Sequence, residues 1–572
     1  MKANRITCQP PLVASFLSIS LLTSGLLPAC KDPDDGTNWT ATGGGGNTDG
    51  TGDGDGDGDG DGDGDSPRDE SDRASVCDTS KIAPAVLRRL TAKEYQATIR
   101  DIFPQIDTQW AGVAMGGDRV GPSGFTNDAR SLLMGPQSAE EVHRTALDVA
   151  TLIVRSEVVD GILPCAESAP DTACVESFVD AYGDRLYRRT LDSTERSELV
   201  SYYESVASRS DFTMGLKWMI VAMLQSPFFI YRSELGNDAG ALSPEEIATQ
   251  LAYAFSGRPP SAELLSKAQA GGLDAPENRV AEATAMLETP DGRAMLQEYF
   301  RQWLGYLAVR TASKQDIPNF NDVRDSMATE TQMFLDNIIF ETQGGMDELM
   351  TSTQTYLDPT LANHYGFPTP ASGFAATERP VGGGIGILAQ GSVLSAMSHV
   401  DITSPVARGL FVYENLLCGL KPKVPDNVPP ITEAAEANTT RERFEIAHGA
   451  PACKDCHAVF EPFGFGMEDF DNSGRFRSME GQFPINALAT APLPGGGEIT
   501  FDGLEDLAEK LAQSPRVANC FSGLLATYAY SGAGGEICLA ETERAAFVAR
   551  ETSILEYFAH LAGAPSMVRR QR

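Results

Sequence analysis

The spacing of apolar side chains restricts the fold of this chain more than any other feature. From Ser80 almost to the C-terminus they recur every three or four residues, as Ile247, Leu251 and Phe255 do. This spacing is typical of amphipathic helices that pack on their neighbours. The chain is therefore predicted to be mainly α, a multi-domain helical protein.

Capping chemistry marks where several of these helices begin. A side-chain acceptor stands before the first turn and a glutamate follows three residues later, which is the pattern of a capping box. Patterns typical of strands are scarce, with candidates at 384–387 and 498–501. The predicted capping boxes are Thr91 with Glu94, Asp192 with Glu195, and Ser243 with Glu246.

Residues 30–79 contain a segment, 42–65, that cannot form a folded core. This segment ends in a strict alternation of glycine and aspartate from Gly52 to Asp65, which offers no apolar side chain to bury. We therefore predict a disordered, solvated linker. Its carboxylates supply part of the chain's net charge of −34. That charge argues against a nucleic-acid partner, because such binding depends on Lys and Arg side chains.

The N-terminus, residues 1–29, has the pattern of a secretory signal peptide. Lys2 and Arg5 precede an apolar stretch at 11–27 that is too short for a comfortable membrane span. The sequence LPAC at 27–30 is similar to the lipobox of bacterial lipoproteins. We expect lipidation of Cys30 and an exported, membrane-anchored protein, periplasmic or on the cell surface.

Six further cysteines form an even set, which in an exported chain is typical of disulfides. Two pairs would each close a short connection, and the third pair follows by elimination. The expected pairs are Cys165 with Cys174, Cys520 with Cys538, and Cys77 with Cys418.

The strongest chemical signal is CKDCH at 453–457, a C-x-x-C-H motif. It is the signature of c-type haem attachment, in which two thiols form thioethers with the haem vinyl groups and the histidine binds the iron. We predict that Cys453, Cys456 and His457 hold a covalent haem, with His457 as metal ligand. The alternatives are a redox dithiol, a plain disulfide, and a zinc half-site for which only His448 is nearby.

A second ligand to the iron would decide between electron transfer and chemistry on small molecules. Met467 lies ten residues beyond His457, and the proline and glycines between them could return its sulfur to the opposite haem face. We include Met467 among the expected haem-binding residues. The other candidates are His448, Met397 and His399.

Residues 469–480 have the ligand offsets of an EF-hand calcium loop. Two arginines, at 475 and 477, lie inside the loop and would oppose a cation. A turn in which the acids pair with these arginines is favoured over a weak Ca²⁺ site. The residues at the ligand positions are Asp469, Asp471, Ser473 and Glu480.

Several longer motifs occur together along the body of the chain. They are L-x-R-L-T-x-x-E-Y at 87–95, S-P-F-F-x-Y-R at 226–232, T-S-P-x-x-R-G at 403–409, C-x-x-C-H at 453–457 and F-D-x-x-G-x-x-R at 470–477. With this set, the body resembles the multi-domain exported proteins of planctomycetes and myxobacteria. Those proteins are built from domains of unknown function around a planctomycete-type cytochrome C domain.

This resemblance, together with proline and glycine clusters, implies a domain organisation. After the signal peptide (1–29) and linker (30–79), we expect a helical domain of unknown function at 80–160, a helical domain with Cys165 and Cys174 at 161–236, a further domain of unknown function at 237–380, a cytochrome c-like domain at 381–492, and a C-terminal helical domain at 493–572.

The expected function is that of a cell-surface or periplasmic lipoprotein carrying covalent haem c, in electron transfer or an unidentified oxidoreductase reaction. The family has no established reaction, so catalytic residues are unknown. An acidic surface predicts a redox partner that docks through a basic patch. The alternative is a non-enzymatic helical binding or scaffold lipoprotein, with a Cys453–Cys456 disulfide and no haem.

Overall fold

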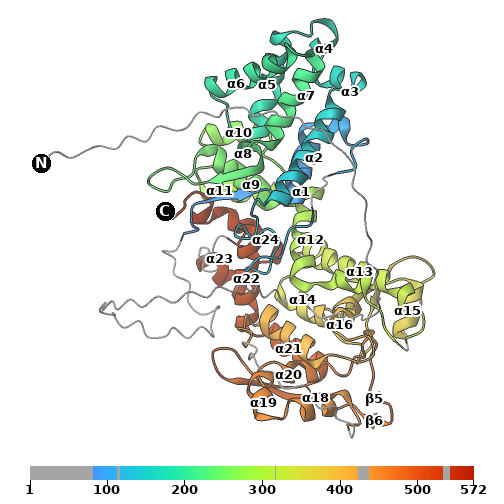
Figure 1. Cartoon of the computed structure of the whole chain (residues 1–572). Helices are drawn as coiled ribbons and strands as arrows, with labels where there is room; N and C mark the ends of the chain where they lie inside the picture. Colours follow the sequence, from blue (N-terminus) through green and yellow to red (C-terminus); the bar gives the residue numbers. More distant parts are fainter. Residues whose placement is uncertain (1–81, 113–115, 316, 423–436, 533–540, 572) are drawn as a thin grey trace, which may run out of the picture. The chain divides into compact units, whose positions relative to one another are not determined.

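The computed structural model describes residues 82–112, 116–315, 317–422, 437–532 and 541–571. The predicted signal peptide, the linker, Cys30, Cys77 and Cys538 lie outside these ranges. Helices dominate the described residues, as predicted, and the strands are short (Figure 1). None of the described helices is both long and apolar enough to cross a membrane.

All three predicted capping boxes are formed, at the starts of α1, α6 and α9. At α1 the hydroxyl of Thr91 accepts a hydrogen bond from the Glu94 N–H at 3.1 Å, and the Glu94 carboxylate accepts one from the Thr91 N–H at 2.8 Å. These bonds satisfy N–H groups that have no partner within the helix, and so fix where the helix begins.

The first helices of the described chain share one apolar core, which runs from Leu90 to Ile230 and includes Tyr253. Its members come from inward-facing positions such as Phe103, Phe178 and Met219, all fully buried. The helices are α1 (Ala92–Ile102), α2 (Pro136–Ile153), α3 (Ser156–Ile162), α4 (Cys165–Ser168), α5 (Thr172–Tyr187), α6 (Ser193–Ala207), α7 (Phe212–Gln225) and α8 (Pro227–Ile230).

A second core extends from Phe125 to Met567 and joins helices from most of the remaining chain. A small third cluster lies around α13 and α15. The helices are α9 (Pro244–Ser256), α10 (Ala262–Gln269), α11 (Pro276–Leu287), α12 (Pro290–Leu304), α13 (Phe320–Asp336), α14 (Met346–Thr351), α15 (Pro359–Tyr365), α16 (Gly391–Ala396), α17 (Pro405–Leu410), α18 (Thr440–His448), α19 (Pro451–His457), α20 (Glu461–Phe465), α21 (Gly503–Ala512), α22 (Pro515–Ala529), α23 (Glu541–Val548) and α24 (Ile554–His560).

The strands of the described residues pair two by two, always antiparallel. The predicted strand at 498–501 is confirmed within β8. The one at 384–387 is wrong, because Gly384 and Gly386 have φ values of 78° and 61°, which a strand does not adopt. The pairs are β1 (Val86–Arg89) with β2 (Tyr231–Glu234), β3 (Gln354–Leu357) with β4 (Ala375–Glu378), β5 (Met479–Glu480) with β6 (Phe483–Pro484), and β7 (Leu488–Pro492) with β8 (Glu498–Asp502).

The disulfides confirm one predicted pair and correct the others. Cys165 and Cys174 are joined, closing the short connection between α4 and α5. Cys520, however, is joined to Cys418 across 102 residues. The predicted partners of Cys520 and Cys418 were wrong because packing of the residues around Cys418 against α22 brings these two cysteines together, and sequence spacing carries no signal of that packing.

Candidate functional site

Helix α19 carries the C-x-x-C-H motif on one face. The helix begins at Pro451, a residue well suited to a first turn because its missing N–H has no role there. Cys453, Cys456 and His457 are spaced three and four residues apart, so they lie on the same side of the helix. Both thiols are free and half-buried.

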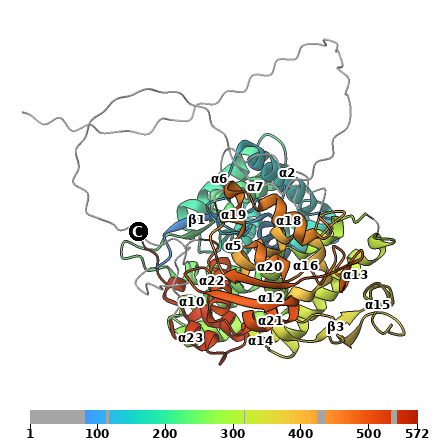
Figure 2. The same cartoon turned by 90° about the horizontal axis from the view of Figure 1, so that it is seen from below.

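Two residues from neighbouring helices meet the motif histidine. His448 is the last residue of α18 and Glu461 the first of α20, and these helices lie next to α19 in both views (Figures 1 and 2). The Glu461 Oε1 atom lies 2.8 Å from Nδ1 of His457 and also forms a short contact with Nδ1 of His448. His448 and Glu461 are buried, and the His457 side chain is one-quarter exposed.

The contacts to one carboxylate oxygen fit one tautomer of the neutral imidazole in both rings. A carboxylate oxygen accepts hydrogen bonds, so in this tautomer each Nδ1 is the donor. The Nε2 of the same neutral ring then carries the lone pair that can bind a metal. The two rings stack with their centroids 3.6 Å apart, which covers a face of His457 but leaves its lone pair, in the ring plane, free of this contact.

This residue set fits a covalently attached haem. Two free thiols and one imidazole share a helix face, and the imidazole has its Nδ1 engaged, as metal-bound histidines usually do. The same neighbourhood also fits a single metal ion, because ligand atoms of His448, His457 and Glu461 lie within 4.8 Å of one another. Two imidazoles and a carboxylate suit divalent transition metals.

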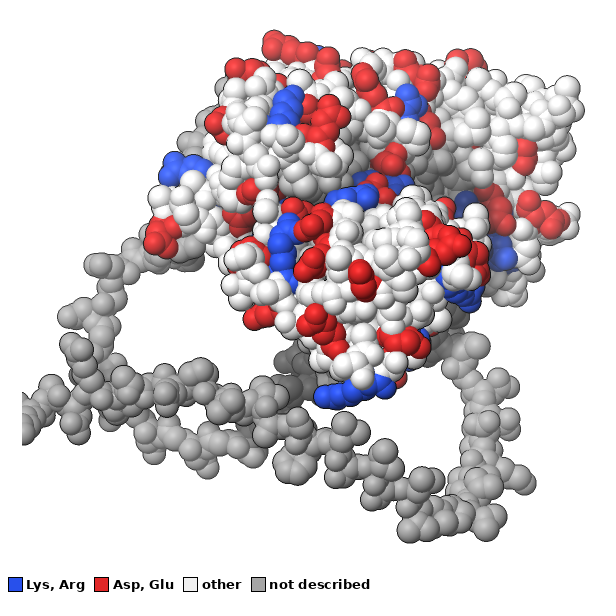
Figure 3. Space-filling view, turned by 90° about the horizontal axis from the view of Figure 1, so that it is seen from above, with Lys and Arg blue, Asp and Glu red and all other residues white. Residues whose placement is uncertain are grey.

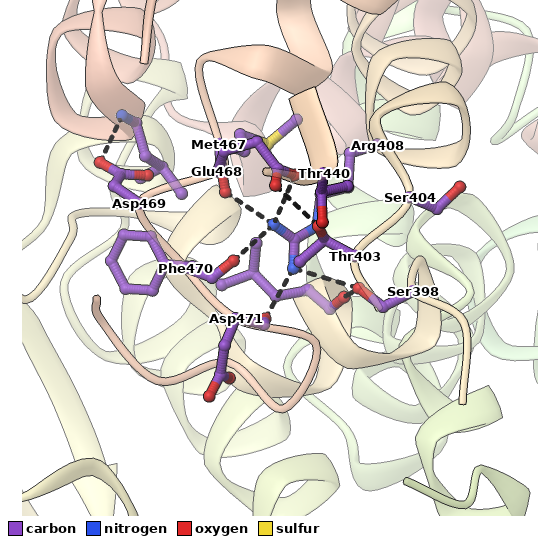
Figure 4. A network of polar contacts seen from close by, with 12 residues as sticks. Ser398, Thr403, Ser404, Arg408, Thr440, Met467, Glu468, Asp469, Phe470 and Asp471 are labelled. Atoms are coloured by element: carbon purple, nitrogen blue, oxygen red, sulfur yellow. Dashed lines mark hydrogen bonds and ion pairs between the residues drawn. The ribbon is translucent and has the colours of Figure 1, made fainter. Parts of the chain in front are cut away.

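Met467, the expected second haem ligand, belongs to the apolar core and is 2% exposed. Its backbone is fixed by the buried guanidinium of Arg408, which donates to the carbonyl oxygens of Met467, Phe470 and Asp471 at 2.6, 2.8 and 2.8 Å (Figure 4). Met467 is thus packed in the core, and the side chain that stacks on His457 is that of His448.

The other candidates for the second ligand have different surroundings. Two imidazoles on opposite sides of a metal have nitrogen atoms roughly 4 Å apart, twice the ~2.0 Å metal–nitrogen bond. The His448 and His457 centroids are closer than that, so in this arrangement His448 is not opposite His457. Met397 packs against the core, and the His399 carbonyl accepts from the Lys314 ammonium at 2.9 Å.

The loop at 469–480 forms a turn that pairs acids with arginines, the favoured prediction. Asp471 accepts from the Arg475 guanidinium at 2.8 Å, and Glu480 lies 3.7 Å from that of Arg477. Asp469 instead accepts from the Leu504 N–H. Ser473 donates to Asp471 at 2.8 Å. Of the predicted Ca²⁺ ligands, Asp469, Asp471, Ser473 and Glu480, only Asp471 and Ser473 therefore contact each other in the hydrogen bonds and ion pairs of the described chain.

Asp469 gives the site a testable pH dependence. Burial raises the pKa of its carboxyl to about 7, from 3.8. The stability linked to this group is present below pH 3.8 and is lost as pH rises through about 7. The variant D469N is therefore expected to gain stability relative to the parent as pH rises from 4 to 8, by up to about 4 kcal/mol at 1.36 kcal/mol per pKa unit.

Denaturant unfolding of both proteins at pH 4, 6 and 8 measures this difference. D471N is a control with the opposite expected sign, because the hydrogen bonds to Asp471 and its contact with Arg475 outweigh burial and hold the pKa of Asp471 below 3.8. It should destabilise the chain at pH 8. An advantage of D469N that does not change with pH would contradict the assignment.

Sequence reasoning missed Glu461. It stands four residues after His457, so on a continuous helix it would lie on the same face. That spacing was the available signal, but the helix ends at His457 and Glu461 begins the next one. His448 was named only as one of several candidate ligands.

Comparison with protein families covers much of the described chain. Four models match, each described as a protein of unknown function: PSD3 (DUF1587) at residues 88–155, PSD5 (DUF1595) at 174–234, PSD4 (DUF1592) at 242–367 and PSCyt3 (DUF1588) at 385–480. The chain belongs to this group of multi-domain proteins. The predicted resemblance is thereby confirmed, and the C-x-x-C-H motif lies inside the segment matched by the cytochrome-named PSCyt3 family.

Searches of curated proteins and of solved structures found no match. The matches to the PSD and PSCyt families therefore indicate how the domains are arranged, but they indicate no reaction. The function has to be argued from the residues around His457.

Proposed function

We propose that this PSD/PSCyt protein binds one haem c covalently and transfers electrons through it. Cys453 and Cys456 would form the thioethers and His457 would bind the iron. The observation that carries the proposal is the geometry of α19, where both free thiols share a face with a histidine whose Nδ1 is held by Glu461. The PSCyt3 match supports the cytochrome-like character of the segment.

In this mechanism the haem supplies a site that gains and loses one electron. The chain's own residues attach and orient it. Cys453 and Cys456 would hold the haem on α19 through thioethers, the Glu461 carboxylate would accept the hydrogen bond of the His457 Nδ1–H, and His457 Nε2 would be the atom that binds the iron. The stacked His448 ring limits rotation of His457.

We further propose that the protein acts outside the cytoplasm as a lipoprotein anchored through Cys30. Haem attachment to such motifs fits an exported chain, and the LPAC sequence supports lipid anchoring. Figure 3 shows Asp and Glu side chains spread over one face, with Lys and Arg in smaller separate groups. A redox partner with a basic patch would be attracted to such a surface.

The test is production of the full chain in a host with a c-type maturation system, followed by intact mass and a pyridine haemochrome spectrum. We expect a mass increase of roughly 0.6 kDa and a c-type spectrum. The double variant C453A/C456A should lose both. D455N, altered at an exposed position between the cysteines, should keep both. A parent chain without covalent haem would refute the proposal.

A second candidate is a mononuclear metal site formed by His448, His457 and Glu461, which the closeness of their ligand atoms favours. Stoichiometric metal without covalent haem would support it. The scaffold alternative predicts neither bound metal nor covalent haem. In that case a Cys453–Cys456 disulfide would lower the intact mass by two hydrogens.

A further inference from the structure

Glu461 is set apart from the other carboxylates of the described cytochrome-like segment by what its Oε1 atom contacts. That single atom reaches Nδ1 of two stacked histidines. The side chain of Glu461 is buried, and so is that of His448. The aromatic ring of Phe444 packs edge-on against His448, and Phe460 lies 5.2 Å from the His457 ring. The carboxylate thus contacts the imidazoles in a largely water-excluded setting.

We propose that Glu461 is a positioning residue for His457 that lowers the reduction potential of the attached haem. This inference rests on the haem attachment proposed above. Glu461 does not touch the iron. It acts through the Nδ1–H of His457, which it orients and polarises.

The physical reason has two parts that act in the same direction. A carboxylate that accepts a hydrogen bond from the Nδ1–H makes the imidazole a more basic ligand, and a more basic ligand favours the more highly charged ferric iron. The negative charge of a buried carboxylate also favours the ferric state, because burial weakens the screening by water. The site should therefore resist reduction more than one whose histidine lacks this carboxylate.

The position of Met467 also favours a low reduction potential. A methionine opposite the histidine raises the potential of a cytochrome. Met467 is packed in the core with its carbonyl bound to Arg408. The described residues thus combine a carboxylate behind the proximal histidine with a methionine held by other contacts.

The experiment compares the holoprotein with E461Q, which keeps an oxygen acceptor but removes the charge. We expect full covalent haem in both, and a shift of the oxidised-to-reduced equilibrium toward reduced haem in E461Q by at least tenfold. For a one-electron couple that equals about 59 mV. Spectroelectrochemical titration measures the potential, and intact mass measures haem content.

D455N is the matched control, because it removes a charge from an exposed position of α19, where water and salt screen it. Its potential should differ from the parent by less than twofold in the same equilibrium. A second variant, E461D, guards against failure of E461Q to fold. Its carboxylate is one methylene shorter and should give a smaller shift of the same sign.

The outcomes separate the two proposals. Absence of covalent haem from the parent refutes the haem proposal itself. Full haem loading with no more shift in E461Q and E461D than in D455N overturns the role of Glu461 and leaves haem attachment standing.

Discussion

Replacing Arg408 by methionine is expected to destabilise the cytochrome-like segment by about 3 to 5 kcal/mol, because several buried acceptors lose their donor and a buried carboxylate loses one of its two cations. The Arg408 side chain is 1% exposed and its guanidinium lies 3.9 Å from the buried Glu468 carboxylate, whose nearer partner is Arg477 at 2.9 Å. Methionine would also leave the carbonyl oxygens of Met467 and Phe470 without their donor. Each such loss costs about 1 to 3 kcal/mol when the group stays buried.

Thermal and urea unfolding of the full chain, followed by circular dichroism, would measure the loss. R408K tests geometry, because an ammonium keeps the charge but lacks the planar fork that reaches several carbonyls. It should also be destabilised. R144M removes an exposed ion pair on α2 and should change stability by no more than about 0.5 kcal/mol. Equal stability of R408M and R144M would contradict the prediction.

Local chemistry made much of the fold predictable. The capping boxes at Thr91, Asp192 and Ser243 involve residues three apart, so the sequence contains both partners of each bond. The Cys165–Cys174 disulfide is local in the same way. Cys418–Cys520 is not, because it depends on how the two segments pack. The strand expected at 384–387 failed because two of its glycines adopt left-handed backbone angles.

The same distinction between local and long-range contacts applies to the candidate site. The thiols and histidine of C-x-x-C-H lie within one helix, so their spacing was enough to predict that they act together. The contact of His448 with His457 requires α18 and α19 to meet, and the role of Glu461 requires the chain to turn after His457. No periodicity encodes those angles. The spacing from His457 made Met467 a candidate ligand. Its place in the core, with its carbonyl bonded to Arg408, depends on contacts between distant residues that spacing does not predict.

The largest effect in the N-terminal half is expected from E234Q. Glu234, at the end of β2, accepts from the Arg88 guanidinium at 2.6 Å and from that of Arg570 at 2.5 Å, and all three side chains are almost completely buried. Burial opposes ionisation, but the arginines outweigh it and hold the pKa of Glu234 at about 2. Glutamine would leave two buried cations beside Arg232 without their shared anion. We expect a loss of about 3 to 5 kcal/mol.

The same region joins the last described residues to the segments around β1 and β2, since the Arg570 N–H donates to the Gly240 carbonyl and residue 571 pairs with Pro84. E234Q should therefore speed hydrogen exchange in β1 and β2 together.

Because the pKa of Glu234 is depressed, the stability that its carboxylate contributes is present above pH 4.5 and lost as pH falls through about 2. The stability difference between parent and E234Q should hold from pH 8 to 5 and shrink below that. E140Q, at an exposed ion pair, is the control. If E234Q unfolded like E140Q, the prediction that this cluster stabilises the contact of Arg570 with β1 and β2 would be wrong.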